Sequence, residues 1–205
     1  RSTKAEVILP LPGETKESFM RGIEDFASSG ISSLTIYTLM LLNGTEFKNT
    51  QYRKEFDIKG RFRIVPLNFG EYEGEKIFDF EEVGIQTKDM PFEDYLYLRG
   101  FALMIESLVN GRAFEDFFLY SKSLGVGRTE FLKRIYDNIK KAPDTLQCNL
   151  ENFLEETKGE LWESEKELVD YYRQEKKYHL LKSGKVGGNL IYKYKVLNVV
   201  FSNSD

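Results

Sequence analysis

Cysteine and histidine are almost absent from this sequence. Its 205 residues include one cysteine, Cys148, and one histidine, His179. A single cysteine excludes an intrachain disulfide framework and cannot hold an iron–sulfur cluster, which needs several thiolates. A single histidine excludes most histidine-based metal sites. We interpret His179 as a surface group, because it lies among lysines near a helix end where a cation is favourable. We interpret Cys148 as a buried or half-buried thiol, because it shares an apolar spacing with Leu146 and Phe153.

Long apolar runs, an excess of basic residues and several catalytic motifs are also absent. No run reaches eighteen apolar residues and no signal peptide is visible, so we expect no membrane partner and a cytoplasmic location. The formal net charge is −4, whereas a nucleic-acid platform needs a basic surface. The G-x-S-x-G elbow of many hydrolases and the GxxxxGK[ST] phosphate loop are both missing. A hydrolase is therefore the least favoured function.

A strand, a sharp turn and a helix are predicted near the start of the sequence. Residues 7–9, Val-Ile-Leu, form a continuous apolar run that is typical of a strand covered on both faces. Two prolines then end the strand, Gly13 permits a turn, and Thr15 is a suitable cap for a helix over 16–28. A second strand is predicted over 33–42. Together these segments indicate one βαβ unit.

The remaining sequence predicts a hairpin and then a helical region. A short helix is expected over 46–56, and a strand over 61–66 is joined by a turn over 68–76 to an antiparallel strand over 76–87. From Pro91, which suits a first helical position, every element reads as helix. The predicted helices cover 92–109, 113–124, 129–140, 146–157, 164–181 and 189–201. We expect an α/β segment over 1–88 and a helical region over 89–205.

Four ordered segments resemble one enzyme family. They are the LPGET-x-ESF segment over 11–19, LLNGTE over 41–46, RFRIVP over 61–66 and EEVGIQT over 81–87. They resemble radical S-adenosylmethionine enzymes, especially the cobalamin-associated subclass, and the likeness is weaker beyond about Gly111. In that family the first segment follows the fifth strand of a (βα)6 partial barrel. The resemblance implies the last two βα units of a partial TIM-like barrel, with a β-hairpin and a C-terminal helical region.

The resemblance also implies cofactors that this chain cannot hold alone. In the family, a CxxxCxxC motif near the first strand binds a [4Fe–4S] cluster that acts on S-adenosylmethionine, and cobalamin is a further candidate cofactor. This sequence has no such motif. The chain is therefore expected to be the C-terminal fragment of a longer enzyme, with the N-terminal half of the same protein as its partner. It would act on an unknown small-molecule substrate and would not be catalytic by itself.

The family resemblance places an adenosine pocket at the ends of the first two strands. It assigns apolar contacts to Leu9 and Leu11, and backbone contacts to Leu39 and Met40. From the residues alone, the turn over 10–15 has two interpretations: a plain βα connection, or a place where amides at the start of a helix approach a ligand. We interpret Glu14 as an acid favoured by the helix dipole.

Two further expectations follow from the missing strands and from the helical half. A strand over 7–9 without its neighbour leaves an apolar edge, which predicts a homodimer through that edge unless other parts of the chain cover it. The alternative to an enzyme fragment is a non-enzymatic α/β-plus-helical protein-interaction module, in which the helical half docks a partner. The acidic residues over 71–82 are interpreted as a solvated hairpin surface.

Overall fold

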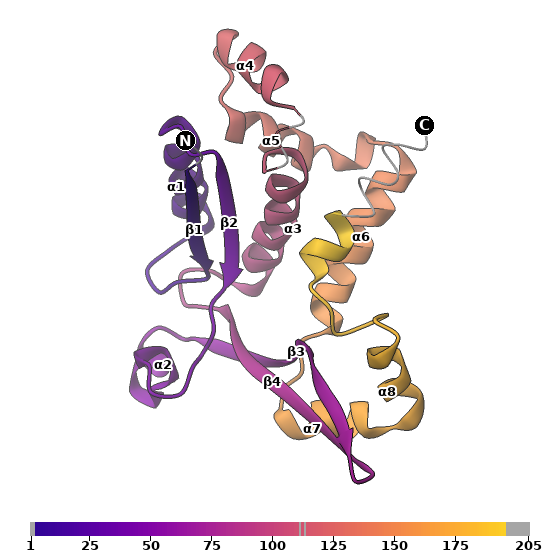
Figure 1. The fold of residues 1–205 in the computed structure, drawn as a ribbon. Helices are drawn as coiled ribbons and strands as arrows, with labels where there is room; N and C mark the ends of the chain where they lie inside the picture. The colour runs from indigo at the N-terminus through magenta and orange to yellow at the C-terminus, as the bar shows by residue number, and fades with distance from the viewer. Residues whose placement is uncertain (1–2, 111, 113, 196–205) are drawn as a thin grey trace.

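Two parallel strands joined through a helix form the first sheet. The computed structural model describes residues 3–110, 112 and 114–195, and it is a mixed α/β structure (Figure 1). Strand β1 spans Lys4–Leu9, helix α1 spans Lys16–Ser28 and strand β2 spans Ser33–Thr38. Strands β1 and β2 pair in parallel, with Ile8 opposite Tyr37. The predicted βαβ unit is therefore confirmed.

The ends of α1 follow from its sequence. The side chain of Thr15 accepts a hydrogen bond from the Ser18 amide at 3.1 Å, and the Ser18 hydroxyl accepts one from the Thr15 amide at 2.9 Å. This reciprocal capping box satisfies amides that have no partner within the helix. Gly30 follows the helix with a φ of +77°, a conformation that glycine adopts without strain. The inner face of α1 buries Phe19 and Ile23.

Removal of this cap gives a first testable prediction. We expect Thr15→Ala to lower the free energy of unfolding by about 1 kcal/mol, because the Ser18 amide loses its hydrogen-bond acceptor. Urea denaturation monitored by circular dichroism measures the change. Thr145→Ala, at an exposed position in the first turn of a later helix, is the matched control and should change stability by less than about 0.5 kcal/mol. Equal effects of the two substitutions would contradict the role assigned to the cap.

The prediction that residues 7–9 are covered on both faces is wrong. Ile8 is 43% exposed and Tyr37 is 49% exposed, and their pairing in register places both on one face of the sheet. The opposite face packs toward α1 and the long helix α3 (Phe92–Leu108), and there Leu34 and Ile36 join the core. In the part of the chain that the structure describes, β2 is the only strand that pairs with β1. An apolar run alone does not reveal whether both of its faces are covered within the chain.

Strand β2 ends earlier than predicted, because the chain turns there to join the hairpin. The Leu41 amide donates to the Glu82 carbonyl and the Gly84 amide donates to the Leu39 carbonyl, both at 2.8 Å. The predicted helix over 46–56 is two pieces, a 3₁₀ turn at Glu46–Lys48 and helix α2 at Thr50–Glu55. Asn49 separates them, and its side chain caps α2.

The hairpin is antiparallel as predicted, but its first strand is longer, and its second strand is shifted by one residue. Strand β3 spans Lys59–Tyr72 and strand β4 spans Glu75–Gln86. Residues 68–72, which were predicted as part of a turn, continue β3, and the reversal takes only Glu73 and Gly74. An irregularity in register between Ile64 and Phe69 allows the second half of β3 to keep pairing with β4.

The region after the hairpin is helical, as predicted, with differences at several boundaries. Pro91 is the residue before helix α3, which spans Phe92–Leu108, and is not its first residue. The predicted helix over 164–181 breaks at Gln174, whose ψ of 131° is not helical. Residues 190–195 are helical, and the rest of the helix predicted to end at 201 lies outside the described residues, as does residue 113. The helices are α3 (Phe92–Leu108), α4 (Glu115–Ser123), α5 (Arg128–Asp137), the 3₁₀ turn Ile139–Lys141, α6 (Asp144–Gly159), α7 (Glu165–Arg173) and α8 (Glu175–Lys182).

The main hydrophobic cluster draws residues from both sides of position 88. It includes Leu9 and Phe19 from the first segment together with Phe101 and Phe153 from the helical region. A second cluster packs the hairpin against α7 and α8. The division into 1–88 and 89–205 stays a prediction. None of the helices within the described ranges is long and apolar enough to cross a membrane.

Candidate functional site

Three backbone amides of the turn between β1 and α1 have hydrogen-bond acceptors within the chain. The Gly13 amide donates to Asp89 at 3.1 Å, and the Glu14 amide donates to the Leu11 carbonyl at 3.2 Å. The Thr15 amide is held by the capping box. This geometry fits a plain βα connection better than a set of amides that faces a ligand. Burial raises the pKa of Glu14, which lies beside this turn.

The structure brings together the ends of the two strands that were predicted to contact adenosine. The Leu39 amide donates to the Leu9 carbonyl at 2.7 Å. The side chains of Leu9 and Leu39 are buried, and Leu11 packs partly against the small cluster that contains Leu39. Met40 is 41% exposed. A ligand at this edge would therefore meet the Met40 side chain and part of Leu11, and it would reach Leu9 and Leu39 only through their backbone.

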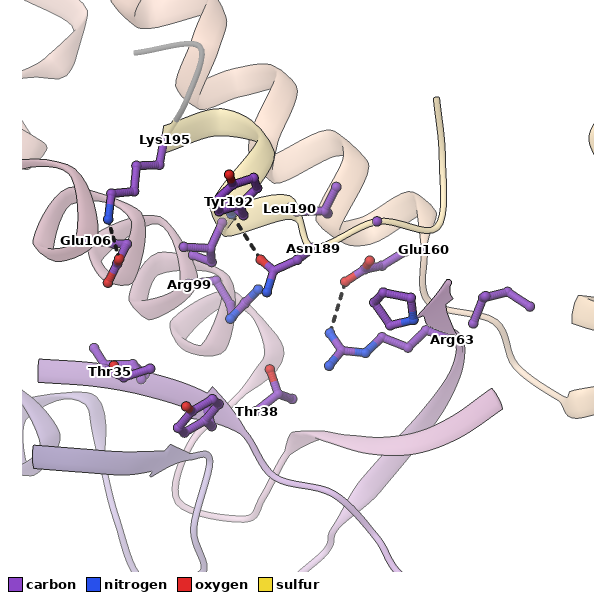
Figure 2. Close-up of a pocket in the computed structure, with 16 residues that line it drawn as sticks. Thr35, Thr38, Arg63, Arg99, Glu106, Glu160, Asn189, Leu190, Tyr192 and Lys195 are labelled. Carbon is purple, nitrogen blue, oxygen red and sulfur yellow. Dashed lines mark hydrogen bonds and ion pairs between the residues drawn. The ribbon is translucent and has the colours of Figure 1, made fainter. Parts of the chain in front are cut away.

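A separate cleft of about 300 Å³ lies beside β2 (Figure 2). Its floor is the edge of β2 that does not pair with β1, and its walls are α3, β3, the C-terminal end of α6 and the segment 188–195. Side chains from all five parts of the chain reach it, and none of these contacts was predicted from the sequence. The charged residues that line it are Arg63, Arg99, Glu106, Glu160 and Lys195.

Arg63 joins two carboxylates at one end of this cleft. Its Nε atom lies 2.6 Å from Glu81, and its Nη1 atom lies 3.2 Å from Glu160. All three side chains are at least four-fifths buried. Burial raises the pKa of Glu160 above its ordinary value, although the guanidinium groups of Arg63 and Arg99 favour the charged form.

The opposite end of the cleft also carries paired charges. Lys195 forms an ion pair with Glu106 at 2.5 Å, and Glu106 accepts a further hydrogen bond from the Asn110 amide group. The side-chain oxygen of Asn189 accepts from the Tyr192 amide at 3.0 Å, which begins the short helical segment over 190–195. The Lys195 ammonium, the Glu106 carboxylate and the side-chain oxygen of Asn189 therefore each have a partner within the chain.

Arg99 differs from the other charged residues of the cleft. It projects from α3 and is 6% exposed, and its Nε atom is buried without a hydrogen-bond partner among the described residues. Its charge acts on Glu160 through space, without an ion pair within 4 Å. Its guanidinium carbon lies 5.9 Å from the centroid of the Phe153 ring. The Thr38 hydroxyl, which lines the same cleft, is likewise buried and without a partner among the described residues. Two residues that line one cleft, Thr38 and Arg99, therefore each carry a buried polar atom with unused hydrogen-bonding capacity.

One signal in the sequence pointed to part of this site. Residues 92–109 were predicted to be apolar on nearly every side, and Arg99 is a charged residue in the middle of that run. A buried cation needs an anion or an acceptor, so this signal could have marked Arg99, although the sequence analysis did not use it. Thr38, Arg63 and Glu160 carried no comparable signal, because their meeting depends on how β2, β3 and α6 pack.

The two rare side chains lie outside this site. His179 is exposed on α8, as predicted. Cys148 is also exposed, so the prediction of a buried or half-buried thiol is wrong: it occupies the outer side of α6, next to the buried Asn149 and Leu150. Among residues 3–110, 112 and 114–195, no group of three or more His, Cys, Asp or Glu side chains is placed to hold a metal ion.

Comparisons with known proteins add no identification. No protein-family model matches the chain, and neither does any curated protein. Function is therefore inferred from the residues and from their geometry.

Proposed function

We propose that this chain is the C-terminal part of a radical S-adenosylmethionine enzyme of the cobalamin-associated subclass. It would supply the last two βα units of a (βα)6 partial barrel and a helical cap over the barrel mouth. Two features support the proposal. The LPGET turn stands at the carboxyl end of β1, where open α/β folds bind ligands, and β1 and β2 run parallel with α1 between them.

The observation that carries the proposal is the uncovered face of the first sheet. Ile8 and Tyr37 are neighbours in register and stand on the face opposite to α1, and each is more than two-fifths exposed. The strand pair also leaves one side of β1 without a strand among the described residues. A two-stranded sheet with an apolar exposed face is marginal in water. Further barrel strands from the N-terminal half of the same protein would cover both the face and the edge.

The described residues fit the cofactors of such an enzyme unequally. Met40 fits a place beside an adenosine group, because its side chain is exposed and its amide and carbonyl form no hydrogen bond with other described residues. The cluster does not fit here, since its thiolate ligands are absent and Cys148 stands alone. We assign the cluster, and cobalamin if it is used, to the N-terminal half. S-adenosylmethionine bound to the cluster would supply the radical chemistry, and this chain would position the adenosine and exclude water.

A matched pair of substitutions tests the barrel. In the longer polypeptide encoded by the same gene, Ile8→Glu places a charge inside a closed sheet, whereas Ile77→Glu places one on the exposed hairpin. The two isoleucines have similar exposure in this chain, 43% and 50%. After anaerobic reconstitution with iron and sulfide, we expect the longer protein and its Ile77→Glu variant to form 5′-deoxyadenosine from S-adenosylmethionine. We expect Ile8→Glu to lose at least 90% of this activity or of the folded protein, because burying an unpaired carboxylate is costly.

The chain over 1–205 alone provides the control. Here both substitutions should change the free energy of unfolding by less than about 1 kcal/mol, because both positions face solvent. This chain should also take up no stoichiometric [4Fe–4S] cluster. Stoichiometric uptake by residues 1–205, or equal behaviour of the two variants in the longer protein, would contradict the proposal.

A second function is supported by a different surface. Helix α4 and its flanks expose several large apolar side chains, which is the property expected of a protein-interaction module. If the longer gene product does not cleave S-adenosylmethionine, docking of a partner by the helical region becomes the better interpretation. The predicted homodimer through the free edge of β1 stays a prediction under both interpretations. The exposed residues are Phe114, Phe117, Leu119, Tyr120 and Leu124.

A further inference from the structure

We propose that the cleft beside β2 binds a small-molecule carboxylate, with Arg99 as the residue that holds the carboxylate group and the Thr38 hydroxyl as a second donor. The proposal does not depend on the radical S-adenosylmethionine assignment. It rests on two unpartnered polar side chains that face the same cavity from α3 and from β2 (Figure 2).

Arg99 has the properties of an anion-binding residue without an ion-pair partner among the described residues. A guanidinium group carries five N–H donors and remains charged at every relevant pH. Arg99 is 94% buried, yet it forms no ion pair within 4 Å among the described residues, and its buried Nε–H has no described acceptor. Its contact with the Phe153 ring fixes the orientation of the guanidinium but offers no acceptor lone pair. A ligand carboxylate would pair with two of these donors in parallel.

The charge of the cleft favours a monoanion over a dianion. Three cations line it, Arg63, Arg99 and Lys195, and they face two carboxylates, Glu106 and Glu160. The lining therefore carries one surplus positive charge. Glu81 does not line the cleft, but it forms an ion pair with Arg63 and so offsets this surplus positive charge. A carboxylate would neutralise Arg99 without strong repulsion, whereas the second charge of a phosphate monoester would lie close to Glu160 and Glu106.

The walls of the cleft suggest an apolar body for this ligand. Ile36, Ile64, Leu190 and Ile191 lie between the charged ends, and the volume of about 300 Å³ stands at the lower end of the range for small-molecule sites. Thr38 lies on the floor near the carboxyl end of β2, where its hydroxyl can donate to the second carboxylate oxygen. A compact aromatic or branched carboxylate fits this combination of size and polarity.

Titration of the chain over 1–205 with benzoate tests the site. Benzamide is the neutral isostere, and inorganic phosphate is the dianionic probe. We expect benzoate to bind saturably with one site per chain and to shift the Arg99 Nε–H signal in NMR spectra of arginine side chains. Benzamide and phosphate should each bind at least about tenfold more weakly. Benzamide has no charge to pair with Arg99, and the second charge of phosphate is repelled by Glu160 and Glu106. Weak or absent benzoate binding, or equal affinity for benzamide, would overturn the proposal.

Substitutions then assign the roles of the two residues. Arg99→Gln and Arg99→Lys should each weaken benzoate binding by about tenfold or more, since lysine keeps the charge but not the planar fork. Thr38→Val, which is nearly isosteric, should weaken it about threefold to tenfold. The exposed Arg21→Gln on α1 is the matched control and should leave affinity unchanged. If Arg99→Gln does not fold, Arg99→Lys and Thr38→Val still decide: unchanged affinity in these folded variants would refute the assigned roles.

Discussion

Replacement of Phe153 by alanine is expected to lower the free energy of unfolding by about 3–5 kcal/mol. Phe153 is fully buried in α6 and belongs to the main hydrophobic cluster. Its ring lies 5.6 Å from the Tyr194 ring, in an edge-to-face arrangement, and it supports the Arg99 guanidinium on its other side. The loss of stability has two causes: the apolar area of the ring is no longer buried, and a cavity is left beside the Arg99 guanidinium. Urea denaturation at neutral pH measures the change.

The matched control for Phe153 is Phe117→Ala on α4. Phe117 is 46% exposed, so its removal should cost less than about 1.5 kcal/mol. Phe153→Ala should also weaken benzoate binding, because Arg99 loses the surface that holds it in place. A small loss of stability with Phe153→Ala, similar to that of the control, would show that α6 does not close the core between α3 and the segment over 190–195.

The elements that could be predicted from the sequence are those whose signals are local. Helix α1 begins and ends where Thr15 and Gly30 place its caps, because both residues act on the backbone within a few positions. The parallel pairing of the first two strands followed from the helix between them, since such a crossover favours parallel strands. Antiparallel pairing in the hairpin followed from its short glycine-containing connection.

The features that could not be predicted depend on which distant segments meet. Ile8 reads as a core residue in its own apolar run, but nothing in the described chain covers its face of the sheet. Strand β2 ends at Thr38 because residues 39–41 pair with β4, a contact that no local pattern encodes. The cleft is the strongest case, since Thr38, Arg99 and Glu160 are far apart in the sequence. Arg99, a cation within an apolar helix, carried a local signal, but the sequence analysis did not select it as a candidate.

A second large effect is expected at the charged end of this cleft. Arg63→Met should destabilise the protein by about 3–5 kcal/mol at neutral pH. Arg63 is the only described cation within 4 Å of Glu81 and of Glu160, so its removal leaves two buried carboxylates unpaired. The exposed ion pair of Arg134 and Glu130 supplies the matched control, and Arg134→Met should cost less than about 1 kcal/mol.

The pH dependence separates loss of charge pairing from loss of packing. Burial already raises the pKa of Glu160 in the folded protein, so its contribution to stability is fully present below its unfolded pKa and is lost as pH rises through the folded value. Removal of the Arg63 cation raises the pKa of Glu160 further. The cost of Arg63→Met should therefore be larger at pH 8 than at pH 5. In the double variant Arg63→Met/Glu160→Gln the cost should be smaller at pH 8 and should vary less with pH, because Glu81 is then the one unpaired carboxylate. A cost that is the same at both pH values would mean that Arg63 stabilises the fold through the packing of its aliphatic stem instead of through its charge.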